Sequence, residues 1–142
     1  TICLDVRQMK DGDCAGFAAF NGDSGLLTIK LQKGQYTLTM SEESVQLTND
    51  TKAITDVASK EVETVKLPKG KVGKIYLRVD GDFNPGRDTA NFYYSLDGKT
   101  FTQIGTKDYK MRFDYRRLFM GTRYAAFYYP TSQTGGQVVL TL

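Results

Sequence analysis

The sequence predicts an antiparallel all-β domain with a jelly-roll sandwich fold, and three observations support this. Apolar and polar residues alternate with a period of two in several short segments, as in strands that bury one face. Clusters of Gly, Asn and Asp separate these segments and suit turns. No window longer than about ten residues keeps a helical period. Short strands with frequent turns are typical of sandwiches and barrels.

Two kinds of strand are expected in order along the chain. Segments with clear alternation should be half-buried strands, and these are 2–6, 27–31, 36–40 and 62–67. Other apolar runs, several of them apolar on both faces, should add further strands, and these are 14–20, 74–79, 91–96, 123–129 and 137–142.

One connection and one ambiguous stretch can be interpreted locally. Asp97 and Gly98 lie between two strand-like runs, which predicts a tight hairpin with a primed turn or a bulged variant of it. The stretch from Asp108 to Phe119 is polar and aromatic, and we expect a loop or a short helical turn there.

Length and composition predict one folded domain over residues 1–142. Of the 142 residues, 40% are hydrophobic and 25% are charged, which is enough for a single packed core. The chain starts without Met and both of its ends lie inside strand patterns, so we expect a fragment of a longer polypeptide.

The charge pattern argues against nucleic acid and membranes as partners. The net charge of +3 is dispersed, and its densest basic spot, Lys69, Lys71 and Lys74, surrounds a turn. A nucleic-acid site would concentrate basic residues on one face with aromatic residues between them. No stretch reaches the roughly 18 apolar residues of a membrane span.

The two cysteines, Cys3 and Cys14, cannot form a zinc site because the chain has no histidine and no other cysteine. Both lie in strand-like runs, where a free cysteine behaves as a small buried hydrophobe. We favour free thiols, and a disulfide between them is the alternative.

No catalytic residues are predicted. Without histidine a Ser-His-Asp or Cys-His arrangement is impossible. Glycoside hydrolysis needs two facing carboxyl groups, and Glu61 and Glu63 should share one face of a strand. That spacing is also what the solvent face of any amphipathic strand shows, and we favour the solvent-face interpretation.

Two other side-chain groups are candidates for binding. Asp80 and Asp82 cluster oxygen atoms suited to calcium, although acidic turns are common without a metal, so no cofactor is expected and calcium is the alternative. Exposed aromatic rings offer flat faces for sugars, and Tyr115 and Tyr128 are the candidates for stacking, with packing in the core as the competing role.

Four segments, in matching order and spacing, resemble one known family. They are 9–20 (MKDGDCAGFAAF), 75–79 (IYLRV), 92–101 (FYYSLDGKTF) and 119–127 (FMGTRYAAF). The family is the C-terminal concanavalin A-like β-sandwich of glycoside hydrolase family 43 β-xylosidases and α-L-arabinofuranosidases. The family has further strands before the first segment, and this chain lacks them.

The resemblance implies a non-catalytic accessory sandwich that packs on a catalytic β-propeller of the same polypeptide. The parent enzyme would act on xylan- or arabinan-derived plant oligosaccharides, and it would be periplasmic or secreted because such glycans occur there. A sandwich loop would help close the propeller's pocket, and Phe113 is the candidate for the contacting aromatic, with anchoring of the loop as its other role.

Two other functions remain open. An autonomous carbohydrate-binding module would bind sugars through exposed tyrosines without the propeller. A small sandwich glycanase would need the acidic motif Glu-x-Asp-x-x-Glu on one strand, which is absent.

Overall fold

The computed structural model describes residues 1–20, 23–47, 54–67, 73–82, 89–110, 123–131 and 135–141. Within these ranges the chain forms ten β-strands and no helix. The strands are β1 (Ile2–Asp5), β2 (Asp13–Phe20), β3 (Asp23–Gln32), β4 (Gln35–Leu47), β5 (Ile54–Lys66), β6 (Lys74–Asp82), β7 (Thr89–Ser95), β8 (Thr102–Lys110), β9 (Arg123–Pro130) and β10 (Val139–Thr141). No helix capable of crossing a membrane occurs in the described part of the chain.

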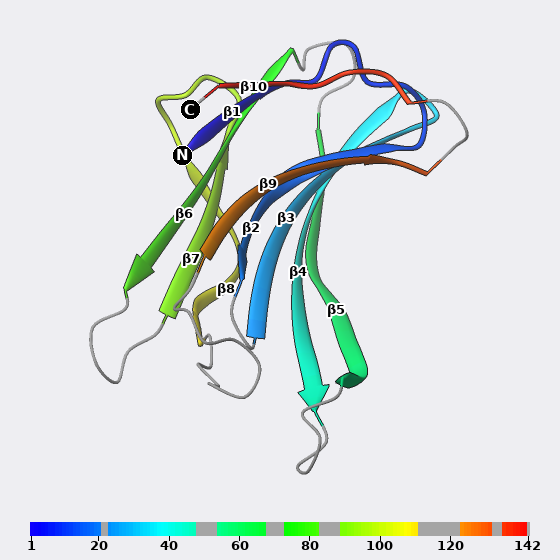
Figure 1. Ribbon diagram of the computed structural model, residues 1–142. Helices are drawn as coiled ribbons and strands as arrows, with labels where there is room; N and C mark the ends of the chain where they lie inside the picture. Colours follow the sequence, from blue (N-terminus) through cyan, green and yellow to red (C-terminus); the bar gives the residue numbers. More distant parts are fainter. Residues whose placement is uncertain are drawn as a thin grey trace.

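The strands form two five-stranded antiparallel sheets that face each other (Figure 1). Sheet I has the order β10-β1-β6-β7-β8, and sheet II has the order β5-β4-β3-β2-β9. The first described strand lies beside the last, because β10 pairs with β1 in sheet I, and in sheet II β9 pairs with β2. The prediction of an antiparallel all-β sandwich is confirmed.

Alternation along the strands builds the core between the sheets. In β3, Leu27 and Ile29 are fully buried, whereas Thr28 between them is only half-buried and faces outward. Leu77 of sheet I is also fully buried and faces the same core. Burying one such side chain stabilises the fold by about 1.5–3 kcal/mol, and the predicted strands are those that supply these residues.

Two glutamates of sheet II accept hydrogen bonds from β8, which is an edge strand of sheet I. The backbone amide of Gly105 in β8 donates a hydrogen bond to Oε1 of Glu63 in β5 at 2.9 Å. The hydroxyl of Thr106 donates to Oε1 of Glu42 in β4 at 2.8 Å. These two contacts connect β8 to the β4-β5 edge of the opposite sheet.

The hairpin expected around Asp97 exists, but its turn is not the tight one predicted. Strands β7 and β8 pair up to Tyr94 and Thr102, so a longer loop separates them. The Asp97 carboxylate accepts hydrogen bonds from the amides of Lys99 and Thr100 at 2.8 and 2.9 Å and closes this loop. Together with a bond from Ser95, these amides lower the pKa of Asp97 to about 2. Gly98 adopts a φ of +77°, which a residue with a side chain rarely does.

The ambiguous stretch after this hairpin is partly strand. Residues 108–110 continue β8, whereas we expected a loop or helical turn from Asp108 to Phe119. Thr89 pairs with Lys110, so β7 supplies the partner that makes this polar segment extended. Residues 111–122 lie outside the described part of the chain.

Candidate functional site

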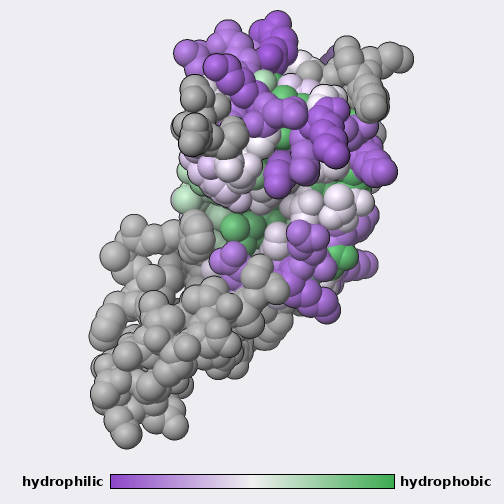
Figure 2. Space-filling model, turned by 90° about the vertical axis from the view of Figure 1, so that its right-hand side faces the viewer, coloured by the Kyte–Doolittle hydropathy of each residue, from purple (hydrophilic) through white to green (hydrophobic). Residues whose placement is uncertain are grey.

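A hollow of about 490 Å³ lies on the outer face of sheet II, on the side away from the core. Sheet II bends so that this face is concave (Figure 1), and hydrophilic side chains gather over the upper part of this side of the molecule (Figure 2). The hollow exists because the residues between the buried positions of β3 and β4 point outward.

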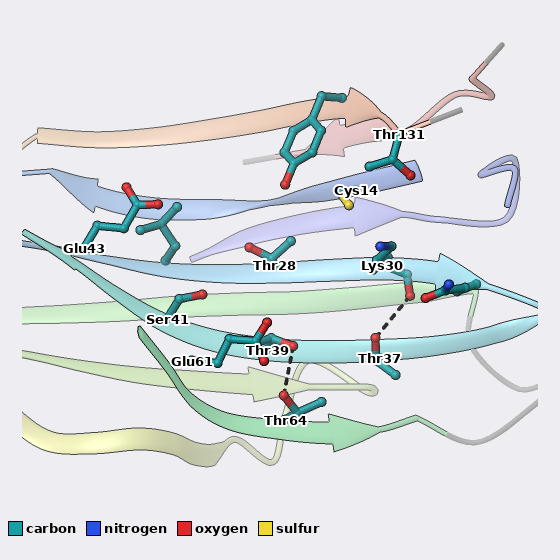
Figure 3. A pocket seen from close by; sticks show the side chains of 13 residues that line it. Cys14, Thr28, Lys30, Thr37, Thr39, Ser41, Glu43, Glu61, Thr64 and Thr131 are labelled. Atoms are coloured by element: carbon teal, nitrogen blue, oxygen red, sulfur yellow. Dashed lines mark hydrogen bonds between the residues drawn. The ribbon is translucent and has the colours of Figure 1, made fainter. Parts of the chain in front are cut away.

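Hydroxyl groups form most of its floor. They stand side by side on neighbouring strands because the register pairs Thr28 with Thr39 and Thr39 with Thr64 (Figure 3). The hydroxyls of Thr39 and Thr64 are 3.1 Å apart and hydrogen-bonded. The Ser and Thr residues that line the hollow are Thr28, Thr37, Thr39, Ser41, Thr64 and Thr131.

Aromatic rings stand beside the hollow at the β9 edge. Tyr129 lines the hollow and is 48% exposed, and its ring stacks on that of Phe127 with centroids 6.0 Å apart and an angle of 22°. Gly16 of β2 pairs with Phe127, and a Cβ on Gly16 would lie 2.6 Å from the Phe127 ring. The missing side chain of Gly16 therefore leaves room for Phe127 to lie close to the sheet.

Both signs of charge line the hollow. Lys30 contributes the ammonium group, and Glu43 and Glu61 contribute carboxylates. Burial raises the pKa of Tyr129, and the Cys14 thiol and then the Glu43 carboxylate raise it further. The Tyr129 hydroxyl therefore stays protonated at neutral pH and can donate a hydrogen bond. This arrangement suits the binding of a polar, uncharged molecule.

Glu61 and Glu63 do not share a face, so our expectation for this pair was wrong. Met40 pairs with Glu63 and the next residue, Ser41, pairs with Glu61, which leaves Val62 as the extra residue of a β-bulge. Glu61 consequently lines the hollow, while Glu63 reaches the amide of Gly105. The bulge directs the two carboxylates to opposite sides of the sheet.

A match to a family model shows how this chain is related to known proteins. The model of the β-xylosidase C-terminal concanavalin A-like domain matches residues 1–139. The chain belongs to this family. The resemblance noted in the sequence is thereby confirmed, and the domain is one found in family 43 glycoside hydrolases.

Two solved structures with the same fold are larger family 43 proteins. One is a glycoside hydrolase engineered to display both endo-xylanase and exo-arabinofuranosidase activity, with a TM-score of 0.78 and 28% identity over 96% of this chain and 26% of that chain. The other is a bifunctional GH43-CE protein of Bacteroides eggerthii, with a TM-score of 0.75 and 31% identity over 98% of this chain and 16% of that chain. This concanavalin A-like chain thus spans about a quarter of one and about a sixth of the other. No curated protein matches it.

Of the three aromatic candidates in this concanavalin A-like domain, the structure describes Tyr128. Phe113 and Tyr115 lie outside the described residues, so their roles stay predictions. Tyr128 is 39% exposed, and its hydroxyl donates a hydrogen bond to Oδ2 of Asp13 at 2.9 Å. That bond fixes Tyr128 against the start of β2, while its neighbour Tyr129 lines the hollow.

Asp13 anchors several segments at this end of the family fold. Its buried carboxylate also accepts hydrogen bonds from the amides of Lys10 and Gly136 at 2.9 and 2.7 Å. Burial by itself would raise the pKa of Asp13, but the three hydrogen bonds outweigh burial and hold the pKa below its ordinary value. The charged carboxylate thus holds β9 and the segment before β10 in place.

The two calcium candidates lie two residues apart on β6. Asp80 forms an ion pair with Arg78 at 2.6 Å, and the Arg78 guanidinium lies over the rings of Tyr93 and Phe101. No group of three potential metal ligands occurs among the described residues, and residues 83–88, which follow Asp82, are outside them. Calcium binding stays a prediction.

Both cysteines are free, as favoured from the sequence. Cys14 lines the hollow of sheet II, whereas Cys3 lines a second hollow on the outer face of sheet I beside Tyr76. A disulfide between them would have to cross both sheets.

The hydroxyl-rich floor is not among the sites predicted from the sequence. Its signal was present as alternate polar positions in two adjacent strand segments, namely Thr28, Lys30 and Gln32 in β3 and Thr37, Thr39 and Ser41 in β4. In the sequence such alternate polar positions look like an ordinary solvent-facing side of a strand. Only the register of β3 with β4 shows that they stand side by side.

Proposed function

We propose that this chain is a non-catalytic accessory β-sandwich of a family 43 glycoside hydrolase that acts on xylan- or arabinan-derived glycans. The observation that supports the proposal most is the match of the β-xylosidase C-terminal domain to residues 1–139. The separation of Glu61 from Glu63 rules out the facing pair considered from the sequence, because a glycosidase needs its two carboxyl groups to face one substrate.

The sandwich packs on a catalytic β-propeller of the same polypeptide and helps to shape its pocket through the segment that contains Phe113. The described strands fix where this segment starts and ends. Lys110 lies beside Thr89, and Arg123 lies beside Phe20, so residues 111–122 connect sheet I to sheet II. A connection of this kind at one end of a rigid sandwich suits a pocket-closing contact.

The proposed role requires no cofactor from this chain. The parent enzyme is placed in the periplasm or outside the cell, because oligomeric and polymeric plant glycans are encountered there.

Kinetics of the parent enzyme with Phe113→Ala test the proposal. We expect KM for xylo- or arabino-oligosaccharides to rise about tenfold, because a contact that closes the pocket contributes binding energy. Tyr93→Ala on β7 removes an aromatic ring outside this segment and is the control, which should leave KM within about twofold.

The isolated chain gives a second readout. It should not hydrolyse the same oligosaccharides. Turnover by the folded chain that is abolished by Glu61→Gln or Glu63→Gln would overturn the accessory role and make the sandwich an enzyme.

A further inference from the structure

The hollow on the concave face of sheet II has a lining that can be read as a candidate ligand site. We propose that its hollow binds a neutral oligosaccharide chain, with the rings at the β9 edge stacking on a sugar and the hydroxyls of β3, β4 and β5 forming hydrogen bonds to it. The hollow lies on a face of the sandwich, whereas the proposed pocket contact comes from residues 111–122.

The size of the hollow fits several linked sugars. Its lining runs from Tyr129 on β9 to Glu61 on β5 and so crosses all five strands of sheet II. Four gaps between strands, at about 4.8 Å each, give a width of roughly 19 Å. Sheet II bends so that the face carrying this lining is concave (Figure 1).

The floor matches the hydrogen-bonding chemistry of sugars. Each Thr or Ser hydroxyl can donate one hydrogen bond and accept others, as a sugar hydroxyl does. The side chains of Thr28 and Ser41 make no hydrogen bond within the described ranges, so both are available for a ligand. Glu61 opposite Ser41 adds carboxylate oxygens that can accept bonds from neighbouring sugar hydroxyls.

The charges favour a neutral chain over an acidic one. Glu43 and Glu61 supply two negative charges against the single positive charge of Lys30. A chain of uronates would place its carboxylates beside these glutamates, and like charges at short range repel. Neutral sugars avoid this repulsion and can use both the donors and the acceptors.

The aromatic wall supplies a stacking surface. The ring of Tyr129 is nearly half exposed, and the stacked Phe127 ring supports it. A flat ring offers a dry face to the C–H side of a sugar, and the lining hydroxyls on β3 and β4 lie on the same outer face. Tyr129, not Tyr128, is therefore the stacking residue of this site.

Calorimetric titration of the 142-residue chain with xylohexaose and with linear arabinohexaose tests the inference. We expect saturable binding of at least one of these neutral chains. Tyr129→Ala should weaken the binding about tenfold or more, as truncation of a central aromatic contact does. Thr39→Val, which keeps the shape and removes one hydroxyl, should weaken it severalfold and guards against loss of folding in the first variant.

Matched controls lie on the opposite sheet. Tyr93→Ala and Thr102→Val change the same residue types on β7 and β8 of sheet I, and both should bind like the unaltered chain. Failure of the folded chain to bind either neutral hexasaccharide at millimolar concentration would overturn the site. Tighter binding of oligogalacturonate than of the neutral chains would also overturn it. Neither result bears on Phe113, whose test uses the kinetics of the parent enzyme.

Discussion

At the scale of single residues, Asp13 connects three separate segments of the chain. Its carboxylate is fully buried and holds the amides of Lys10 and Gly136 and the hydroxyl of Tyr128. The sequence revealed Asp13 only as part of the segment that resembles the family. Two of its partners, Tyr128 and Gly136, lie more than a hundred positions away, and the register of β2 with β9 has to be known to bring Tyr128 to it.

Replacing Asp13 should destabilise the fold. Asp13→Asn keeps the size of the side chain but removes the negative charge that strengthens the three hydrogen bonds to Oδ2, so we expect a loss of about 1–3 kcal/mol in the free energy of unfolding. Urea denaturation at neutral pH measures this loss. Asp80→Asn breaks an exposed ion pair on β6 and is the control, with an expected change of about 0–1 kcal/mol.

The pH dependence of the Asp13 effect has a definite sign. Because folding lowers the pKa of Asp13, its charged form stabilises the fold above the unfolded pKa of about 3.9. This stabilisation is lost as pH falls below 3.9 and through the lower folded pKa. The difference in unfolding free energy between the unaltered chain and Asp13→Asn should therefore shrink in acid. A difference that is equal at pH 7 and in acid would contradict the charged role of Asp13.

At the scale of elements, the β-bulge of β5 has the clearest consequence. Strict alternation would place the side chains of Glu61 and Glu63 on the same face of the sheet. Because Val62 is an extra residue between them, the two side chains point to opposite faces. Alternation in the sequence predicted the strands that supply the core, such as β3 with Leu27 and Ile29. It could not predict the bulge, because an inserted residue changes the pairing with β4 and leaves the polar pattern of β5 intact.

The two glutamates should respond differently to the same substitution. Glu63→Ala removes the acceptor for the Gly105 amide at the β8 edge and should lower the free energy of unfolding by about 0.5–1 kcal/mol. Glu61→Ala lies on the concave face and should leave stability nearly unchanged while weakening any oligosaccharide binding. Equal losses of stability in the two variants would contradict the bulged register.

At the scale of the whole molecule, the fold class could be predicted and the candidate site could not. The fold follows from alternation and turns, which are local signals. The hollow depends on the bend of sheet II and on the register of five strands, from Thr64 on β5 to Tyr129 on β9. Those are properties of the assembled sheet, and no short segment contains them.

The sandwich places its two thiols on opposite outer faces, and this can be measured. Alkylation of the unreduced, denatured chain followed by mass spectrometry should show two modified cysteines. In the native chain, Cys3 should react faster than Cys14, because Cys14 is buried and Cys3 is partly exposed. Recovery of an intrachain disulfide would contradict the assignment of Cys3 and Cys14 to different sheets.

The pairing of the first strands with the last also determines when the fold can be completed. Strand β1 pairs with β10 and β2 pairs with β9. Residues 123–141 must therefore be synthesised before both sheets have their full set of strands. Contacts of such long sequence separation are slow to form, and until then β1 and β2 each have one edge unpaired. During translation these edges are where misassociation with other chains is most favoured. Release of the last strands from the ribosome is therefore the event that commits this chain to its native sandwich.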